Sequence, residues 1–180
     1  MDRRDLLKLI ALSTGAAFIG SASIFTACAR GPYTRIGRFS ESDVALLDDI
    51  AETILPRTST PGAKDAGVGP FMAMMVEDTY FQHDQEVFET GLAELKTTHC
   101  FAELDAESRT ALLNDLDEEA RRFVRVGAQP AHYFTMMKQL ALLGFFTSEV
   151  GMTQVLRYLP VPGKYDGNFP YALGDRAWAL

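Results

Sequence analysis

The sequence predicts an all-α domain: an irregular bundle of about five to six helices with a long Pro/Gly-rich loop and an irregular aromatic C-terminal tail. Three observations support this fold class. Apolar residues recur at three- and four-residue steps along most of the chain, which is the spacing of one helix face. No segment sustains the two-residue alternation of a half-buried strand. Pro and Gly interrupt the helical pattern at intervals that suit connecting loops.

The first helix is expected to begin after Ser40, which can cap it, with Asp43 in its first turn. Pro56 is expected to end it. One apolar face lies between these limits, made of Val44, Leu47, Ile50, Ala51, Ile54 and Leu55. The following stretch, 56–69, is rich in Pro, Gly, Thr and Ser and is expected to be a long loop.

Caps predict the next three helices. Pro70 suits the first position of a second helix, where its missing N–H costs nothing. Asp84 is expected to cap a third helix and Asp105 a fourth. The stretch 118–126 is expected either to continue the fourth helix or to form a short separate piece.

The last helices differ in character. Pro130 marks the start of a helix that is apolar on most sides as far as Gly144, and such a helix is usually central in its bundle. Thr147 or Ser148 can cap a final short helix that reaches Leu156. Six methionines are expected mainly in the core, with an adaptable interface as the alternative: Met72, Met74, Met75, Met136, Met137 and Met152.

The C-terminal tail contains too many helix breakers to be regular, yet it is aromatic. Two interpretations are open: the tail folds back over the central helix, or it docks on a partner, because aromatic anchors dominate interface energetics. The residues that would face a partner are Phe145, Phe146, Tyr158, Pro160, Pro162, Tyr165, Phe169, Tyr171 and Trp178.

Residues 1–29 are interpreted as a twin-arginine export signal, and residues 30–180 as the folded domain. Arg3 and Arg4 precede a mild apolar run that extends from Leu9 to Ala27. The twin-arginine route carries folded proteins, so the periplasm is the expected location. An ordinary signal peptide or a membrane anchor is the alternative, but a stable span needs about 20 strongly apolar residues and this run is too polar.

The two cysteines leave several alternatives open. Cleavage after Ala29 would remove Cys28, whereas reading the preceding residues as a lipobox makes Cys28 the lipidated first residue of a membrane-associated protein. Cys100 would then be unpaired, and it is expected either to be buried as a small apolar residue or to form a disulfide with another subunit.

Composition and motifs exclude several functions. The net charge of −7 and the pI near 4.9 are unsuited to nucleic acid, whose binding needs clustered Lys and Arg. The sequence has no covalent-haem or iron–sulfur cysteine spacing and no Gly-x-Gly-x-x-Gly dinucleotide motif. His83, His99 and His132 lie far apart and show no metal-ligand spacing. We therefore expect no catalytic residue, cofactor site or metal site in this chain.

Several ordered sequence blocks resemble the gluconate 2-dehydrogenase subunit 3 family over nearly the whole chain. These blocks follow the twin-arginine leader, and the first and last are the most specific because Pro and Gly punctuate them. They are residues 54–58, 60–68, 88–92, 140–151 and 161–167.

The resemblance implies a small, non-catalytic subunit of a periplasmic dehydrogenase. The implied partner is a large FAD-binding catalytic subunit of the glucose–methanol–choline type, which oxidises a sugar, sugar acid or glycoside. A cytochrome c subunit often takes up the electrons, and the small subunit's leader exports the flavoprotein. The family offers no catalytic residues to assign in this chain. Membrane contact is expected only through a lipid anchor on Cys28 or through the complex.

Two other hypotheses remain. The chain could be a stand-alone periplasmic or lipid-anchored helical binding protein, which would need a pocket lined by methionines and aromatic residues. It could also contribute a side chain such as His132 or Tyr165 to the partner's active site.

Overall fold

The computed structural model describes residues 34–125, 131–161, 163, 166–179. The part from Arg35 onward forms one unit. Its described residues contain five α-helices, three short 3-10 or π-helical segments and no strand, so the predicted all-α bundle is confirmed. The α-helices are α2 (Glu41–Ile54), α3 (Val68–Thr79), α4 (Gln82–Thr97), α5 (Ala106–Arg125) and α6 (Tyr133–Thr147), and the short segments are η1 (Lys64–Ala66), η2 (Phe101–Glu103) and η3 (Gly151–Val155).

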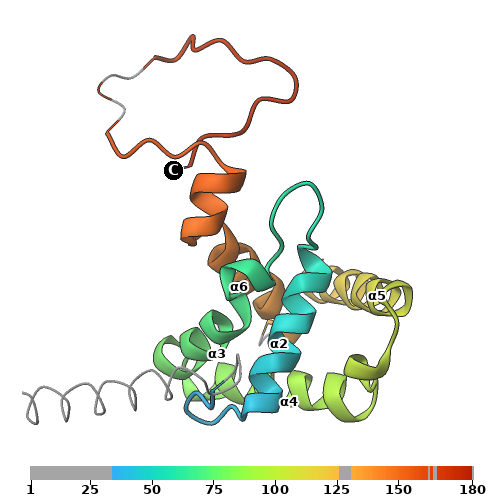
Figure 1. Ribbon diagram of the computed structural model, residues 1–180. Helices are drawn as coiled ribbons and strands as arrows, with labels where there is room; N and C mark the ends of the chain where they lie inside the picture. The colour runs from blue at the N-terminus through green and yellow to red at the C-terminus, as the bar shows by residue number, and fades with distance from the viewer. Residues whose placement is uncertain (1–33, 126–130, 162, 164–165, 180) are drawn as a thin grey trace, which may run out of the picture. The chain divides into compact units, whose positions relative to one another are not determined.

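Helix α2 begins and ends where the sequence predicts. The Ser40 side chain accepts from the Asp43 amide while the Asp43 carboxylate accepts from the Ser40 amide, which is a capping box. Val44, Leu47, Ile50 and Ala51 are fully buried. They form the face of α2 that packs on the other helices of the bundle (Figure 1).

Helix α3 begins two residues before the predicted start at Pro70, so that boundary was wrong. Gly67 reverses the chain with a φ of +64°, a conformation that glycine adopts without steric cost. The buried carboxylate of Asp48 then accepts from the Gly69 amide at 2.9 Å. This contact from α2 caps α3 early, and Pro70 still falls in the first turn.

Of the two further predicted caps, Asp105 is confirmed and Asp84 is not. Asp105 caps α5 by accepting from the Ser108 amide at 2.8 Å, as expected. The prediction for Asp84 was wrong because α4 begins at Gln82 after an extended Phe81, so Asp84 lies within the first turn. Helix α5 continues to Arg125, which supports the single-helix alternative.

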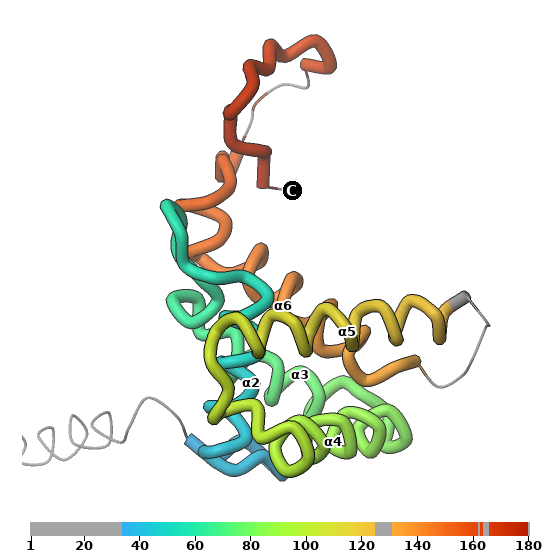
Figure 2. The backbone as a smooth tube through the Cα atoms, turned by 90° about the vertical axis from the view of Figure 1, so that its right-hand side faces the viewer, coloured from blue at the N-terminus to red at the C-terminus, as the bar shows by residue number. Residues whose placement is uncertain are grey.

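Helix α6 is the central helix of the bundle, as its sequence predicts. It contacts α2, α3, α4 and α5 (Figures 1 and 2). Phe134, Met137 and Ala141 are almost entirely buried. A buried side chain the size of Phe or Met contributes about 1.5–3 kcal/mol, so α6 supplies a large share of the core. Its N-cap is His132, whereas the predicted start, Pro130, lies outside the described residues.

The methionines divide between core and surface. Met72, Met136 and Met137 are buried, Met75 and Met152 are partly exposed, and Met74 is exposed. After α6, the Ser148 hydroxyl accepts from the Gly151 amide at 2.9 Å and so caps the last short helix, as predicted. That helix ends in a π-helical turn, η3. None of the described helices combines the length and apolar character that a membrane crossing requires.

Candidate partner interface

The C-terminal tail carries the most exposed apolar surface of the described chain. We call its described residues, 157–161, 163 and 166–179, the aromatic arm. Every residue described between 158 and 178 is exposed. The exposed apolar side chains of the arm are Tyr158, Leu159, Val161, Phe169, Tyr171, Leu173 and Trp178. The bundle therefore does not cover the arm, and the prediction that the tail folds back over the central helix was wrong.

The structure separates the predicted partner-facing residues into three groups. Tyr158, Pro160, Phe169, Tyr171 and Trp178 are exposed on the arm, and Phe146 is 37% exposed on α6. Phe145 is only 3% exposed, so it belongs to the core and not to this surface, although its ring meets that of Phe146 edge to face with centres 5.2 Å apart. Pro162 and Tyr165 lie outside the described residues, as do Arg3, Arg4 and Cys28.

Arg157 lies at the base of the arm. Its guanidinium group is 4.8 Å from the centre of the Trp178 ring and 5.7 Å from that of Phe169. Sequence reasoning missed this residue, since 20 residues lie between Arg157 and Trp178 and no local pattern joins them. Exposed Leu159, Val161 and Leu173 were also missed, although they lie among the predicted aromatic residues.

A second exposed segment, residues 56–60, lies at the same end of the bundle as η3 (Figures 1 and 2). The Glu52 carboxylate holds this loop at its base by accepting from the amides of Arg57 and Lys64, at 3.0 and 2.8 Å. The Arg57 side chain also pairs with Asp65. The base of the loop is therefore held by contacts from α2 and η1.

A shallow groove of about 480 Å³ runs between α5 and α6. Val124 and Leu142 supply exposed apolar surface there. The Asp117 carboxylate lies in the same groove, 2.6 Å from the Lys138 ammonium and 2.6 Å from the Arg121 guanidinium. The bond from Lys138 is the main reason why the pKa of Asp117 lies below its usual value.

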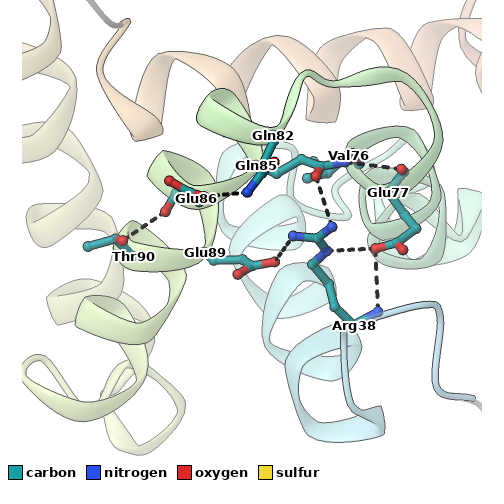
Figure 3. A network of polar contacts seen from close by, with 8 residues as sticks. All are labelled: Arg38, Val76, Glu77, Gln82, Gln85, Glu86, Glu89 and Thr90. Atoms are coloured by element: carbon teal, nitrogen blue, oxygen red, sulfur yellow. Dashed lines mark hydrogen bonds and ion pairs between the residues drawn. The ribbon is translucent and has the colours of Figure 1, made fainter.

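The polar contacts of Arg38 hold the start of the domain against α3 and α4. The Arg38 guanidinium donates to Glu77 on α3 at 2.8 Å and to Glu89 on α4 at 2.9 Å (Figure 3). It also donates to the buried Gln85 at 2.8 Å. These contacts tie the segment before α2 to both helices, and the bonds from Arg38 lower the pKa of Glu77.

The histidines and Cys100 do not form a common site. His132 caps α6 through Nδ1, which accepts from the Phe134 amide at 3.2 Å, and His99 lies 3.6 Å from Glu94. His83 is exposed. In the described part of the chain, no three or more His, Cys, Asp or Glu side chains are grouped to hold a metal ion.

Cys100 was expected either to be buried or to be linked to another subunit, and the burial alternative was wrong. The residue is exposed at the start of η2, where the chain turns with a φ of 46°. Its Sγ atom lies 3.7 Å from the carbonyl oxygen of Thr97. A disulfide with a partner subunit stays a prediction for the assembled complex.

The fold and its surface define a small all-α domain with an uncovered apolar arm. A comparison with protein-family models identifies the family. Residues 41–163 match the model for gluconate 2-dehydrogenase subunit 3, and this span exceeds half of the chain, so the protein belongs to that family. The chain is accordingly a small subunit of a multisubunit dehydrogenase complex. Searches of curated proteins and of solved structures give no match.

Proposed function

We propose that this chain is the small subunit of an exported FAD-dependent dehydrogenase. Its partner is a large flavoprotein of the glucose–methanol–choline type that binds FAD and oxidises a sugar, sugar acid or glycoside. A cytochrome c subunit is the proposed electron acceptor. The observation that carries this proposal is the combination of the family match over residues 41–163 with the Arg3-Arg4 leader.

The proposed role is to escort and stabilise the flavoprotein. A leader of the twin-arginine type exports folded cargo, so one leader can carry two assembled subunits to the periplasm. A small subunit that binds only the folded flavoprotein also stabilises it by mass action. The uncovered apolar arm supports this role, since exposed apolar surface of this kind marks protein interaction sites.

Whether Cys28 is removed or lipidated decides whether the complex is attached to the membrane. Cleavage after Ala29 yields a subunit free in the periplasm, whereas lipidation of Cys28 tethers the complex to the membrane surface. Mass spectrometry of the mature N-terminus distinguishes the two products by the presence of Cys28 and its acyl chains.

The escort role is tested by replacing Arg3 and Arg4 together with lysine and fractionating the host cells. We expect the flavoprotein to stay in the cytoplasm with the small subunit. Arg30→Lys, beyond the apolar run, is the matched control and should leave export unchanged. Full periplasmic flavoprotein in the double variant would show that the escort role is wrong.

A further inference from the structure

The two ends of the aromatic arm are tied together, and its described residues between 158 and 178 are exposed. Its two ends are joined by backbone hydrogen bonds: the Arg157 amide donates to the Ala177 carbonyl at 2.7 Å, and the Ala179 amide donates to the Arg157 carbonyl at 3.0 Å. These bonds form a short parallel bridge between Arg157 and Trp178. The chain that leaves η3 therefore returns to its own starting point (Figures 1 and 2).

Side chains hold the same base. The Arg157 guanidinium lies over the rings of both Trp178 and Phe169, and these rings meet edge to face with centres 5.5 Å apart. A planar guanidinium can stack on aromatic faces in this way, whereas a lysine ammonium cannot reproduce the stacking. Arg176 adds a second tie, because its Nη1 atom donates to the Gln154 carbonyl at 3.0 Å and to the Thr153 carbonyl at 3.4 Å.

The arm is rich in the aromatic residues that interface cores favour. Residues 156–180 contain five aromatic side chains in 25 positions, about twice the 11% aromatic fraction of the whole chain. Interface cores are enriched in Tyr, Trp and Phe. Leu173 is completely exposed and Tyr171 is 72% exposed, so the arm presents apolar side chains that only another molecule can cover.

We infer that Arg157 is a positioning residue which holds the aromatic arm preformed for docking on the large catalytic subunit of the dehydrogenase complex. This inference rests on the proposed flavoprotein partner. The occupant is argued from two observations: the chain belongs to a family of dehydrogenase subunits, and the arm is its most exposed apolar segment. The complementary surface on the large subunit is apolar.

Preorganisation for binding gives a physical reason why the two ends of an exposed segment are tied together. A loose tail would have to lose its backbone and side-chain freedom on binding, and that cost would weaken the complex. Closing the arm at Arg157 removes much of the cost before the partner arrives. Loss of the Arg157 contacts should therefore slow association, while loss of an anchor such as Trp178 should mainly speed dissociation.

The test measures binding of the tagged full-length small subunit to the large flavoprotein purified from the same host. The variants are Arg157→Ala, Arg157→Lys and Trp178→Ala. Arg122→Ala is the matched control, because Arg122 is an exposed arginine on α5 whose ion pair among the described residues is with Glu118. We expect Arg157→Ala to raise the Kd about ten- to hundredfold, mainly through slower association, and Arg157→Lys to have an intermediate effect.

Two further readouts make the result decisive. Thermal unfolding of each free variant should match the wild type, since the arm lies outside the bundle core. Hydrogen exchange at the Ala179 amide should become faster in Arg157→Ala, because loss of the side-chain stacking on Trp178 and Phe169 loosens the bridge in which this amide donates to the backbone carbonyl of residue 157. Unchanged exchange together with weaker binding would make Arg157 a direct contact and would overturn the positioning role.

The remaining outcomes separate this inference from the proposed function. A wild-type chain that captures no flavin-containing protein would refute the proposed partner itself. A wild-type chain that captures the flavoprotein, with Arg157→Ala and Trp178→Ala binding as tightly as Arg122→Ala, would leave the function standing and refute the docking role of the arm.

Discussion

The ring of Tyr133 lies directly against the backbone of Gly91. A Cβ atom on this glycine would fall 2.1 Å from the Tyr133 Cγ atom, far inside van der Waals contact. Glycine in the middle of α4 costs helix stability of about 1 kcal/mol relative to alanine. The close approach of α6 to α4 therefore explains why a glycine occupies this position.

Gly91→Ala should destabilise the bundle despite the better helix propensity of alanine. The added methyl group must push Tyr133 and α6 away from α4, and overpacking of this kind typically costs about 1–3 kcal/mol. Urea denaturation of the mature domain measures the change. Thr90→Ala, at the next and exposed position, is the control and should be neutral or slightly stabilising. Equal stability of the two variants would contradict the contact.

The hydroxyl group of Tyr133 gives a second prediction. It is buried and has no hydrogen-bond partner among the described residues. Burial, assisted by the carboxylates of Glu94 and Glu119, also raises the pKa of this phenol. Tyr133→Phe should therefore leave the free energy of unfolding unchanged or raise it by up to about 1 kcal/mol. A clear loss of stability in thermal unfolding would mean that the hydroxyl is bonded in the protein.

Replacing Gln85 should lower the free energy of unfolding clearly, because its side chain bonds with three other residues. Its amide donates to the Val76 and Glu77 carbonyls at the end of α3, at 2.9 and 3.1 Å, while its oxygen accepts from Arg38 (Figure 3). Gln85→Leu leaves two carbonyls without these donors, and we expect a loss of about 2 kcal/mol. Gln82→Ala removes only an exposed bond to Glu86 and should have little effect. A reversed order in urea unfolding would exclude this account.

The Asp117–Lys138 pair predicts a pH dependence. Because the folded protein lowers the pKa of Asp117, the stabilisation is fully present above the carboxyl group's ordinary pKa, about 4, and is lost as the pH falls through the lower folded value. Asp117→Asn should therefore cost about 1 kcal/mol at neutral pH and progressively less in acid. Asp115→Asn, at an exposed site on α5, is the control. A cost that does not change with pH would contradict the charge pairing.

The sequence predicted local features well where one short pattern determines them. The Ser40 capping box, the Asp105 cap and the central position of α6 all follow from residues that are close in the chain. The starts of α3 and α4 could not be predicted in this way. The early start of α3 depends on Asp48, which reaches Gly69 from a different helix.

The candidate interface also depends on contacts between distant residues, which the sequence did not predict. Aromatic and Pro-rich composition predicted a partner surface in the segment that the structure leaves exposed, but composition cannot tell which side of a helix faces the core, so Phe145 was included beside Phe146. Arg157 was missed because its contacts with Phe169 and Trp178 require the chain to close on itself. Such contacts between distant residues appear only in the folded structure.

The most direct test of the central claim is to purify the tagged chain from its native host under mild conditions. Mass spectrometry of the intact complex and the flavin spectrum of the same fraction then show what is bound. The account predicts one large FAD-containing subunit per small subunit, and its loss when residues 157–180 are deleted, with the bundle still folded. A small subunit that purifies alone, with no flavin in its fraction, would contradict the account.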